Sequence, residues 1–214
     1  MPHVYVAAGS NIDPERHLAL AAAELERAFG PVEISPWYRN KAVGFAGADF
    51  INFVVGFETE EPLPQVIERL RAIETRCGRP RDAPKWAPRA MDLDILLYGD
   101  LVCEEPGLVL PRPDLLKRPY MLGPLADIAP DLVHPTAGST IGELWRRFDR
   151  AAHPLVRVKA PAVGHDSRGV GRDDRGSGRD RTGRNEGRRP GRTGRRSDPT
   201  SRRSDRRRRP GSGR

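Results

Sequence analysis

The chain has 214 residues, which is enough for one folded domain with an appended segment. Its net charge of +8 is unevenly spread, because residues 161–214 carry a net charge of +11 and the first 160 residues a net charge of −3. The composition therefore argues against a basic nucleic-acid-binding domain, and no apolar run approaches the roughly 18 residues that a membrane-spanning helix needs.

The chain opens with a predicted strand and a predicted helix. Val4–Ala8 is a short apolar strand, and the next residues, Gly9, Ser10 and Asn11, are typical of a turn. Apolar residues then recur at helical spacing over residues 14–29. Asp13 is placed to cap this helix at its N-terminus, where Pro14 occupies the first helical position.

Further strands and one more helix follow in the chain. Val32–Tyr38 is expected to be a strand that breaks near Pro36, and Phe50–Thr59 alternates in the manner of a strand with two different faces. Residues 64–77 have helical periodicity, and Met91–Tyr98 is a fourth strand. The segments 40–49 and 79–90 are expected to be loops, and shorter helices are expected within residues 108–149.

The order β-α-β-β-α-β is typical of an α+β fold with a ferredoxin-like core. The short connections and the amphipathic helices favour a mainly antiparallel four-stranded sheet with helices packed on it. Residues 1–155 are therefore expected to form one catalytic domain.

Residues 156–214 are expected to form a disordered tail. Gly, Arg, Asp, Ser and Pro dominate this segment, so it has too little apolar surface to offset the entropy of ordering. Its arginines leave open an alternative function, in which the chain binds nucleic acid non-specifically through electrostatic attraction. Because the tail has no aromatic residues for base stacking, we expect such binding to be incidental.

The clearest chemical signal lies in the fourth strand. Asp92 and Asp94 alternate with Leu93, so they share one face about 6.5–7 Å apart, while Leu93, Ile95 and Leu97 are expected to point into the core. Two carboxylates on one face repel each other unless a cation lies between them. Magnesium carrying substrate phosphates is one such cation, and a pairing of the aspartates with arginine is another.

The loop before this strand is strongly basic, which favours a site that binds magnesium together with substrate phosphates. Arg79, Arg81, Lys85 and Arg89 all lie within reach of phosphates held by the two aspartates, and guanidinium groups bind phosphate oxygens bidentately. A solvated loop of surface charges is the alternative. The chain has no Gly-x-x-x-x-Gly-Lys-Ser/Thr sequence, which excludes a P-loop kinase.

Residues 85–95, read as Lys-Trp-Ala-Pro-Arg-Ala-Met-Asp-Leu-Asp-Ile, resemble the signature of 6-hydroxymethyl-7,8-dihydropterin pyrophosphokinases, Arg-Trp-Gly-Pro-Arg-Thr-Leu-Asp-Leu-Asp-Ile. The resemblance continues in the same order through residues 6–11, 49–52, 74–79 and 118–130. It implies the transfer of pyrophosphate from ATP to the hydroxymethyl-dihydropterin, which yields the pterin diphosphate and AMP for folate synthesis. It also implies a cytoplasmic enzyme, which we expect to be a monomer with two Mg²⁺ ions.

The resemblance also implies a role for each matching residue. The expected metal ligands are Asp92 and Asp94, which with Arg79 and Arg89 form the expected catalytic set. The residues expected to contact ATP are Glu74, Arg79, Arg89, Arg112 and Arg118. The residues expected to contact the pterin are Phe50, Asn52, Trp86 and Tyr120. Two positions depart from the family pattern: Arg112 stands where a His is frequent, and Ala87 where Gly is frequent.

Overall fold

The computed structural model describes residues 1–42, 47–79 and 90–160. In chain order the elements are β1 (His3–Ser10), α1 (Pro14–Phe29), β2 (Glu33–Ile34), β3 (Trp37–Asn40), β4 (Phe50–Glu58), α2 (Leu63–Arg76), β5 (Asp92–Tyr98), β6 (Cys103–Glu105), β7 (Leu108–Leu110), α3 (Pro119–Ile128), α4 (Ile141–Arg147) and β8 (Val156–Val158). No helix in these ranges is both long enough and apolar enough to span a membrane.

The main sheet has the strand order β5-β1-β4-β3-β8, and β2 also pairs with β4. Every pairing in it is antiparallel. The α+β class and the antiparallel sheet are thus confirmed, but the sheet has six strands rather than the expected four. One extra strand arises because the predicted strand at residues 32–38 divides near Pro36 into β2 and β3, and the other is β8.

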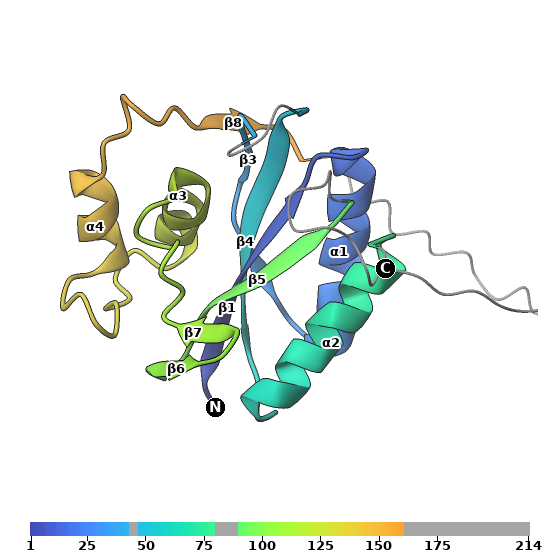
Figure 1. The fold of residues 1–214 in the computed structure, drawn as a ribbon, viewed down its shortest axis with the longest axis horizontal. Coiled ribbons are helices and arrows are strands. Elements are labelled where there is room, and N and C mark those ends of the chain that lie inside the picture. The colour runs from blue at the N-terminus through green and yellow to red at the C-terminus, as the bar shows by residue number, and fades with distance from the viewer. Residues whose placement is uncertain (43–46, 80–89, 161–214) are drawn as a thin grey trace, which may run out of the picture. The chain divides into compact units, whose positions relative to one another are not determined.

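Helices cover both faces of the sheet (Figure 1). On one face, α1 and α2 contribute Leu18, Leu25 and Leu70 to a core that includes Phe53 of β4. On the other face, a second core gathers residues of α3 and α4. The central strands β1 and β4 are buried along almost their whole length because they are covered from both sides.

The prediction for β5 is only partly correct. Leu93 and Ile95 belong to the core on the α1/α2 face, as expected, but Leu97 belongs to the core on the α3 face. The cause is an irregularity in the pairing with β1, where Val6 pairs with Ile95 but Tyr5 pairs with Leu97. The extra residue reverses the alternation of side chains beyond it. The aspartates lie before the irregularity, so their common face is unaffected.

Smaller departures lie near the ends of elements. Asp13 occupies the N-cap position of α1, but its φ of 42° is left-handed and its side chain makes no capping hydrogen bond. The strand β1 continues through Gly9 and Ser10, which the sequence assigned to a turn. The hairpin formed by β6 and β7 was not expected, although its Pro106-Gly107 dipeptide is a turn signal.

The sheet extends past the boundary predicted at residue 155. Strand β8 pairs with β3, with Trp37 opposite Val158, and Val158 packs against the core. Because β8 lies at the edge of the sheet, three residues are enough to add a strand, and so short a segment gives little apolar pattern. The rest of the tail, residues 161–214, lies outside the described residues.

Removing β8 should destabilise the fold. A chain that ends at Leu155 loses the packing of Val158 against the core, at an expected cost of about 1–3 kcal/mol and several degrees of melting temperature. A chain that ends at Pro161 keeps β8 and should have the same melting temperature as the full-length chain. Thermal unfolding followed by circular dichroism checks both truncations. Equal melting temperatures for the two would show that β8 contributes nothing to stability.

Candidate active site

The two aspartates of the motif lie on β5, at the edge of the main sheet. Asp92 is paired with Gly9 of β1, and Asp94 is paired with Ala7. Their side chains retain 20% and 24% exposure, respectively, so the carboxylates are half-buried rather than fully solvated. An edge strand leaves one side open to approach, which is why charged groups from other elements can reach both carboxylates.

Arg79 neutralises Asp92 from the end of α2. Its guanidinium Nη1 lies 2.6 Å from Asp92 Oδ1 and also donates to Glu74 Oε1. The backbone N–H of Arg79 donates to the carbonyl of Glu74, 3.0 Å away, so the chain turns back at this point and directs the side chain toward β5. Arg79 therefore bridges two carboxylates from different elements.

Glu74 connects α2 to the edge strand. Its Oε1 accepts a hydrogen bond of 2.9 Å from the backbone N–H of Leu93. Burial raises the pKa of the Glu74 carboxyl above its ordinary value, although the Leu93 N–H and the positive charge of Arg79 oppose that rise. Glu74 thus holds the strand and Arg79 in place together.

Arg112 neutralises Asp94 from the other side. Its Nη2 lies 3.0 Å from Asp94 Oδ1. The backbone N–H of Arg112 donates to the carbonyl of Leu96, 2.9 Å away, so the segment after β7 is fastened along β5. The Nε of Arg112 is buried and has no hydrogen-bond partner among the described residues.

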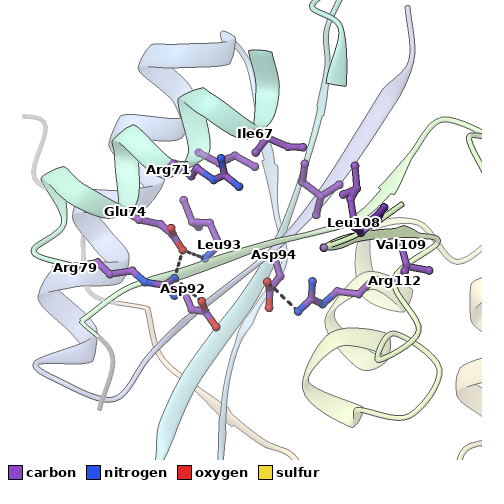
Figure 2. A pocket seen from close by; sticks show the side chains of 14 residues that line it. Ile67, Arg71, Glu74, Arg79, Asp92, Leu93, Asp94, Leu108, Val109 and Arg112 are labelled. Atoms are coloured by element: carbon purple, nitrogen blue, oxygen red, sulfur yellow. Dashed lines mark hydrogen bonds and ion pairs between the residues drawn. The ribbon is translucent and has the colours of Figure 1, made fainter. Parts of the chain in front are cut away.

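These charged groups line a pocket of about 510 Å³ at the edge of β5 (Figure 2). Figure 2 shows the carboxylates of Asp92 and Asp94 between Arg79 on one side and Arg112 on the other. The remaining lining comes from α2, β5 and the β6–β7 hairpin and includes Ile67, Leu70, Arg71, Leu93, Ile95, Leu108 and Val109. The carboxylate pair with Arg79 and Arg112 thus forms the charged end of the pocket, and the other end combines apolar side chains with Arg71.

Two of the residues expected to contact the pterin lie across the sheet from this pocket. Asn52 of β4 pairs with Gly9, which on its other side pairs with Asp92, so the three residues form one row across β4, β1 and β5. A Cβ at Gly9 would lie 2.5 Å from Asn52 Oδ1 and 3.8 Å from a ring carbon of Phe50. Because Gly9 has no side chain, the amide of Asn52 can lie directly over it.

Tyr120 and Arg118 come from the start of α3. Tyr120 is half-buried against the core on the α3 face. Burial raises the pKa of Tyr120; the charge of Arg118 opposes the rise, and the charges of Asp114, Asp94 and Asp92 add to it. Tyr120 is thus within electrostatic reach of the carboxylate pair. Arg118 lies 3.4 Å from Asp114 and does not line the pocket.

The structure brings together five of the predicted site residues in one pocket: Glu74, Arg79, Asp92, Asp94 and Arg112. Arg81, Lys85, Trp86 and Arg89 lie outside the described residues. The sequence reasoning missed the apolar wall and Gly9. Ile67 and Leu70 follow the helical apolar pattern of α2, which by itself indicates a core and not a pocket.

The hydrogen bond from Leu93 to Glu74 should contribute measurably to stability. In Glu74→Ala the Leu93 N–H loses its acceptor, which should cost about 1–3 kcal/mol, whereas Glu74→Gln keeps an acceptor and should cost less than about 1 kcal/mol. Glu68→Ala, at an exposed position of α2, is the control and should change stability by no more than about 0.5 kcal/mol. Urea unfolding measures all three. If Glu74→Gln lowers the stability as much as Glu74→Ala does, then the charge of Glu74 matters and the hydrogen bond from Leu93 does not.

Comparisons with known proteins identify the family of the chain. A model of the 7,8-dihydro-6-hydroxymethylpterin-pyrophosphokinase (HPPK) family matches residues 5–130. A 2-amino-4-hydroxy-6-hydroxymethyldihydropteridine pyrophosphokinase from Synechocystis sp. is 41% identical over 69% of this chain and 76% of its own length. The enzyme of that name from Haemophilus influenzae is 34% identical over 72% of this chain and 96% of its own length.

Solved structures support the fold. A HPPK-DHPS chain in complex with substrates aligns over 68% of this chain with a TM-score of 0.52 and 13% identity. The Plasmodium falciparum HPPK-DHPS with pteroate aligns over the same share with a TM-score of 0.54 and 14% identity. This chain spans less than half of each of those longer chains, 43% and 44% respectively. The match to the family model and the sequence identity to its relatives show that the chain belongs to the 7,8-dihydro-6-hydroxymethylpterin-pyrophosphokinase family.

Proposed function

We propose that this chain transfers a pyrophosphoryl group from ATP to 6-hydroxymethyl-7,8-dihydropterin, forming the pterin diphosphate and AMP in the synthesis of folate. The observation that carries the proposal is the carboxylate pair Asp92 and Asp94, held between two arginines at the charged end of a pocket. The names of the two relatives described above, both pyrophosphokinases of this pteridine, supply the substrate class.

The two ends of the pocket differ, which favours one orientation of a bound ATP molecule. The end away from the aspartates, which includes Ile67, Leu70 and Arg71, suits the flat purine ring, because apolar side chains and a guanidinium group can both pack on its faces, and the charged end suits the phosphates. Arg79 and Arg112 supply the guanidinium groups there, which match phosphate oxygens bidentately. We assign Arg89 to the phosphates and Arg118 to their neighbourhood from the sequence resemblance alone.

The residues present fit magnesium. The described residues contain no group of three or more His, Cys, Asp or Glu side chains that could enclose an ion. Mg²⁺ does not need such a group, because it is commonly held by one or two carboxylates together with substrate phosphates and water. Asp92 and Asp94 would supply the carboxylates, and we expect two ions. Bound Mg²⁺ would withdraw charge from the phosphate oxygens during transfer.

Substrate binding requires an exchange of ionic partners. Arg79 and Arg112 lie 2.6 and 3.0 Å from the carboxylates of Asp92 and Asp94, respectively. When ATP enters with its cations, the same guanidinium groups are free to turn to the phosphates, and each charge keeps a partner. The buried Nε of Arg112, which has no hydrogen-bond partner among the described residues, adds a donor for this purpose. Arg112 therefore serves where relatives frequently have histidine.

The pterin is assigned to the other side of Gly9. Asn52 offers an amide to the edge of the heterocycle, and Phe50 offers an aromatic face. We assign the opposite face to Tyr120. From the sequence resemblance alone we assign the cover of the site to Trp86, which lies outside the described residues. The row from Asn52 through Gly9 to Asp92 supports an arrangement in which the two substrates lie side by side, because neighbouring strands are only about 4.8 Å apart.

The chemistry then depends mainly on positioning. The hydroxymethyl oxygen attacks the β-phosphorus of ATP, the bond from that phosphorus to the bridging oxygen of the α-phosphate breaks, and AMP leaves with the oxygen. The hydroxyl proton passes to solvent. The arginines stabilise charge on the transferred group, and the site needs no covalent intermediate. The loops at residues 40–49 and 79–90 would close over the substrates.

The wider setting is also part of the proposal. We propose that the elements β1 to β5 form a ferredoxin-like core. The order of these elements in the chain and the antiparallel arrangement β5-β1-β4-β3 support this proposal. We place the protein in the cytoplasm as a monomer. The catalytic domain ends after β8 and not at residue 155, and the arginine-rich tail is dispensable for turnover.

An assay of AMP formation tests the proposed function. The purified full chain is incubated with ATP and Mg²⁺, with and without 6-hydroxymethyl-7,8-dihydropterin, and the nucleotides are separated. AMP should form in amounts equal to the pterin diphosphate and only when both substrates are present. Formation of ADP instead of AMP would indicate transfer of a single phosphoryl group and would refute the proposal.

Removing either aspartate should abolish most of the activity and leave the fold intact. Asp92→Ala and Asp94→Ala should each lower kcat by at least about 100-fold, because stabilisation of transferring phosphoryl groups typically contributes several kcal/mol. Both variants should need more Mg²⁺ for half-maximal rate. Steady-state kinetics at varied Mg²⁺ measure these effects.

Two controls accompany the aspartate variants. Asp100→Ala removes an exposed carboxylate just beyond β5 and should leave kcat unchanged. Leu93→Ala removes a core side chain and should cost about 2–5 kcal/mol of stability. Near-normal turnover of the Asp92 and Asp94 variants at low Mg²⁺ would contradict the assignment.

A further inference from the structure

A tight loop, residues 129–140, joins α3 to α4. Within it, Val133 forms a β-bridge with Thr140, and the backbone N–H of His134 donates to the carbonyl of Ser139 over 3.0 Å. The two helices that it joins pack against each other over one face of the sheet (Figure 1). The loop therefore holds the start of α4 next to the end of α3.

The side chain of His134 organises the turn of this loop. It is only 2% exposed. Its Nδ1 accepts from the backbone N–H of Ala137 over 3.2 Å and from that of Thr136 over 3.3 Å, and the Thr136 hydroxyl lies 3.4 Å away. Its Nε2 is buried and has no hydrogen-bond partner among the described residues. The ring thus acts as the acceptor that binds the N–H groups of the loop.

These contacts decide where the proton of the ring lies. A neutral imidazole carries one proton, and only the nitrogen without it can accept a hydrogen bond. Because Nδ1 faces two N–H donors, the proton lies on Nε2. A second proton would set an N–H on Nδ1 against those donors and would place a charge where water does not reach. The folded loop therefore accommodates His134 in its neutral form.

No charged side chain offsets the burial of this ring. Burial lowers the pKa of His134 below its ordinary value, and no neighbouring charge contributes to the change. Glu143 is engaged in the capping box of its own helix, and Arg147 lies 3.5 Å from the hydroxyl of Ser139. The charged residues at the end of α3, in the loop and on α4 are Asp127, Asp131, Glu143, Arg146 and Arg147.

We propose that His134 is an acid-sensitive latch: in its neutral form it fastens the loop between α3 and α4, and protonation of Nδ1 releases the loop. An unfolded or opened loop exposes the ring, which then takes up a proton below about pH 6.5. The contribution of the latch to stability is therefore complete above that pH and is lost as the pH falls below it. The inference does not depend on the proposed function, because it concerns the fold alone.

The test compares the full chain with two variants. His134→Asn keeps an oxygen acceptor close to the position of Nδ1 but does not titrate, and His153→Asn alters an exposed histidine as the control. Urea unfolding gives the equilibrium constant of unfolding at about pH 7.5 and about pH 5.5. Hydrogen exchange followed by NMR gives the protection of the Thr136 and Ala137 amides, and nitrogen NMR of the imidazole shows which ring nitrogen carries the proton.

Between these two pH values the unfolding constant of the unaltered chain should rise about tenfold more than that of His134→Asn, as expected for one proton bound only by the unfolded state. His153→Asn should follow the unaltered chain. The protection of the Thr136 and Ala137 amides should fall about tenfold in the unaltered chain and change less than about twofold in His134→Asn.

Two results would overturn the inference: an equal pH dependence of unfolding in the unaltered chain and in His134→Asn, or protection of the two amides that does not change with pH in the unaltered chain. If His134→Asn does not fold, the unaltered chain still decides the question. Its imidazole should carry the proton on Nε2 and remain neutral at about pH 6, and a proton on Nδ1 would refute the latch.

Discussion

Two carboxylates one residue apart on a single strand face are the constraint on which the site depends. Asp92 and Asp94 are half-buried, so their charges need cations close by. Arg79 at the end of α2 and Arg112 after β7 supply them. The edge position of β5, the turn after α2 and the attachment of Arg112 to Leu96 all serve to bring these cations to the strand.

The same arrangement explains how two chemically different substrates could meet. The charged end of the pocket lies at β5, and the polar contact that we propose for the heterocycle is Asn52 of β4. Only Gly9 of β1, which has no side chain, separates Asn52 from Asp92 in the row of paired residues. Strand pairing, which is fixed by the buried cores on both faces, thereby sets the spacing of the site.

The sequence predicted those parts of the fold and site that depend on local pattern. The limits of α1, the two faces of β4 and the common face of Asp92 and Asp94 follow from periodicity, and the structure agrees. Leu97 was misplaced because an irregularity in strand pairing leaves no trace in the alternation of an apolar strand. The hydrogen bond from Asn52 to Asn40 and the row from Asn52 through Gly9 to Asp92 depend on contacts between strands, which a single sequence does not encode locally.

Metal binding in the absence of nucleotide tests the central claim, that Arg112 and a metal cation compete for the carboxylate of Asp94. Mg²⁺ is titrated calorimetrically into the ATP-free chain, into Arg112→Gln and into Asp94→Asn. If Arg112 competes with the cation for Asp94, Arg112→Gln should bind Mg²⁺ at least about threefold more tightly, since a full positive charge about 3 Å from the ligand oxygen is removed. Asp94→Asn should bind it more weakly than the unaltered chain. An Arg112→Gln variant whose affinity for Mg²⁺ is unchanged or lower would contradict the account.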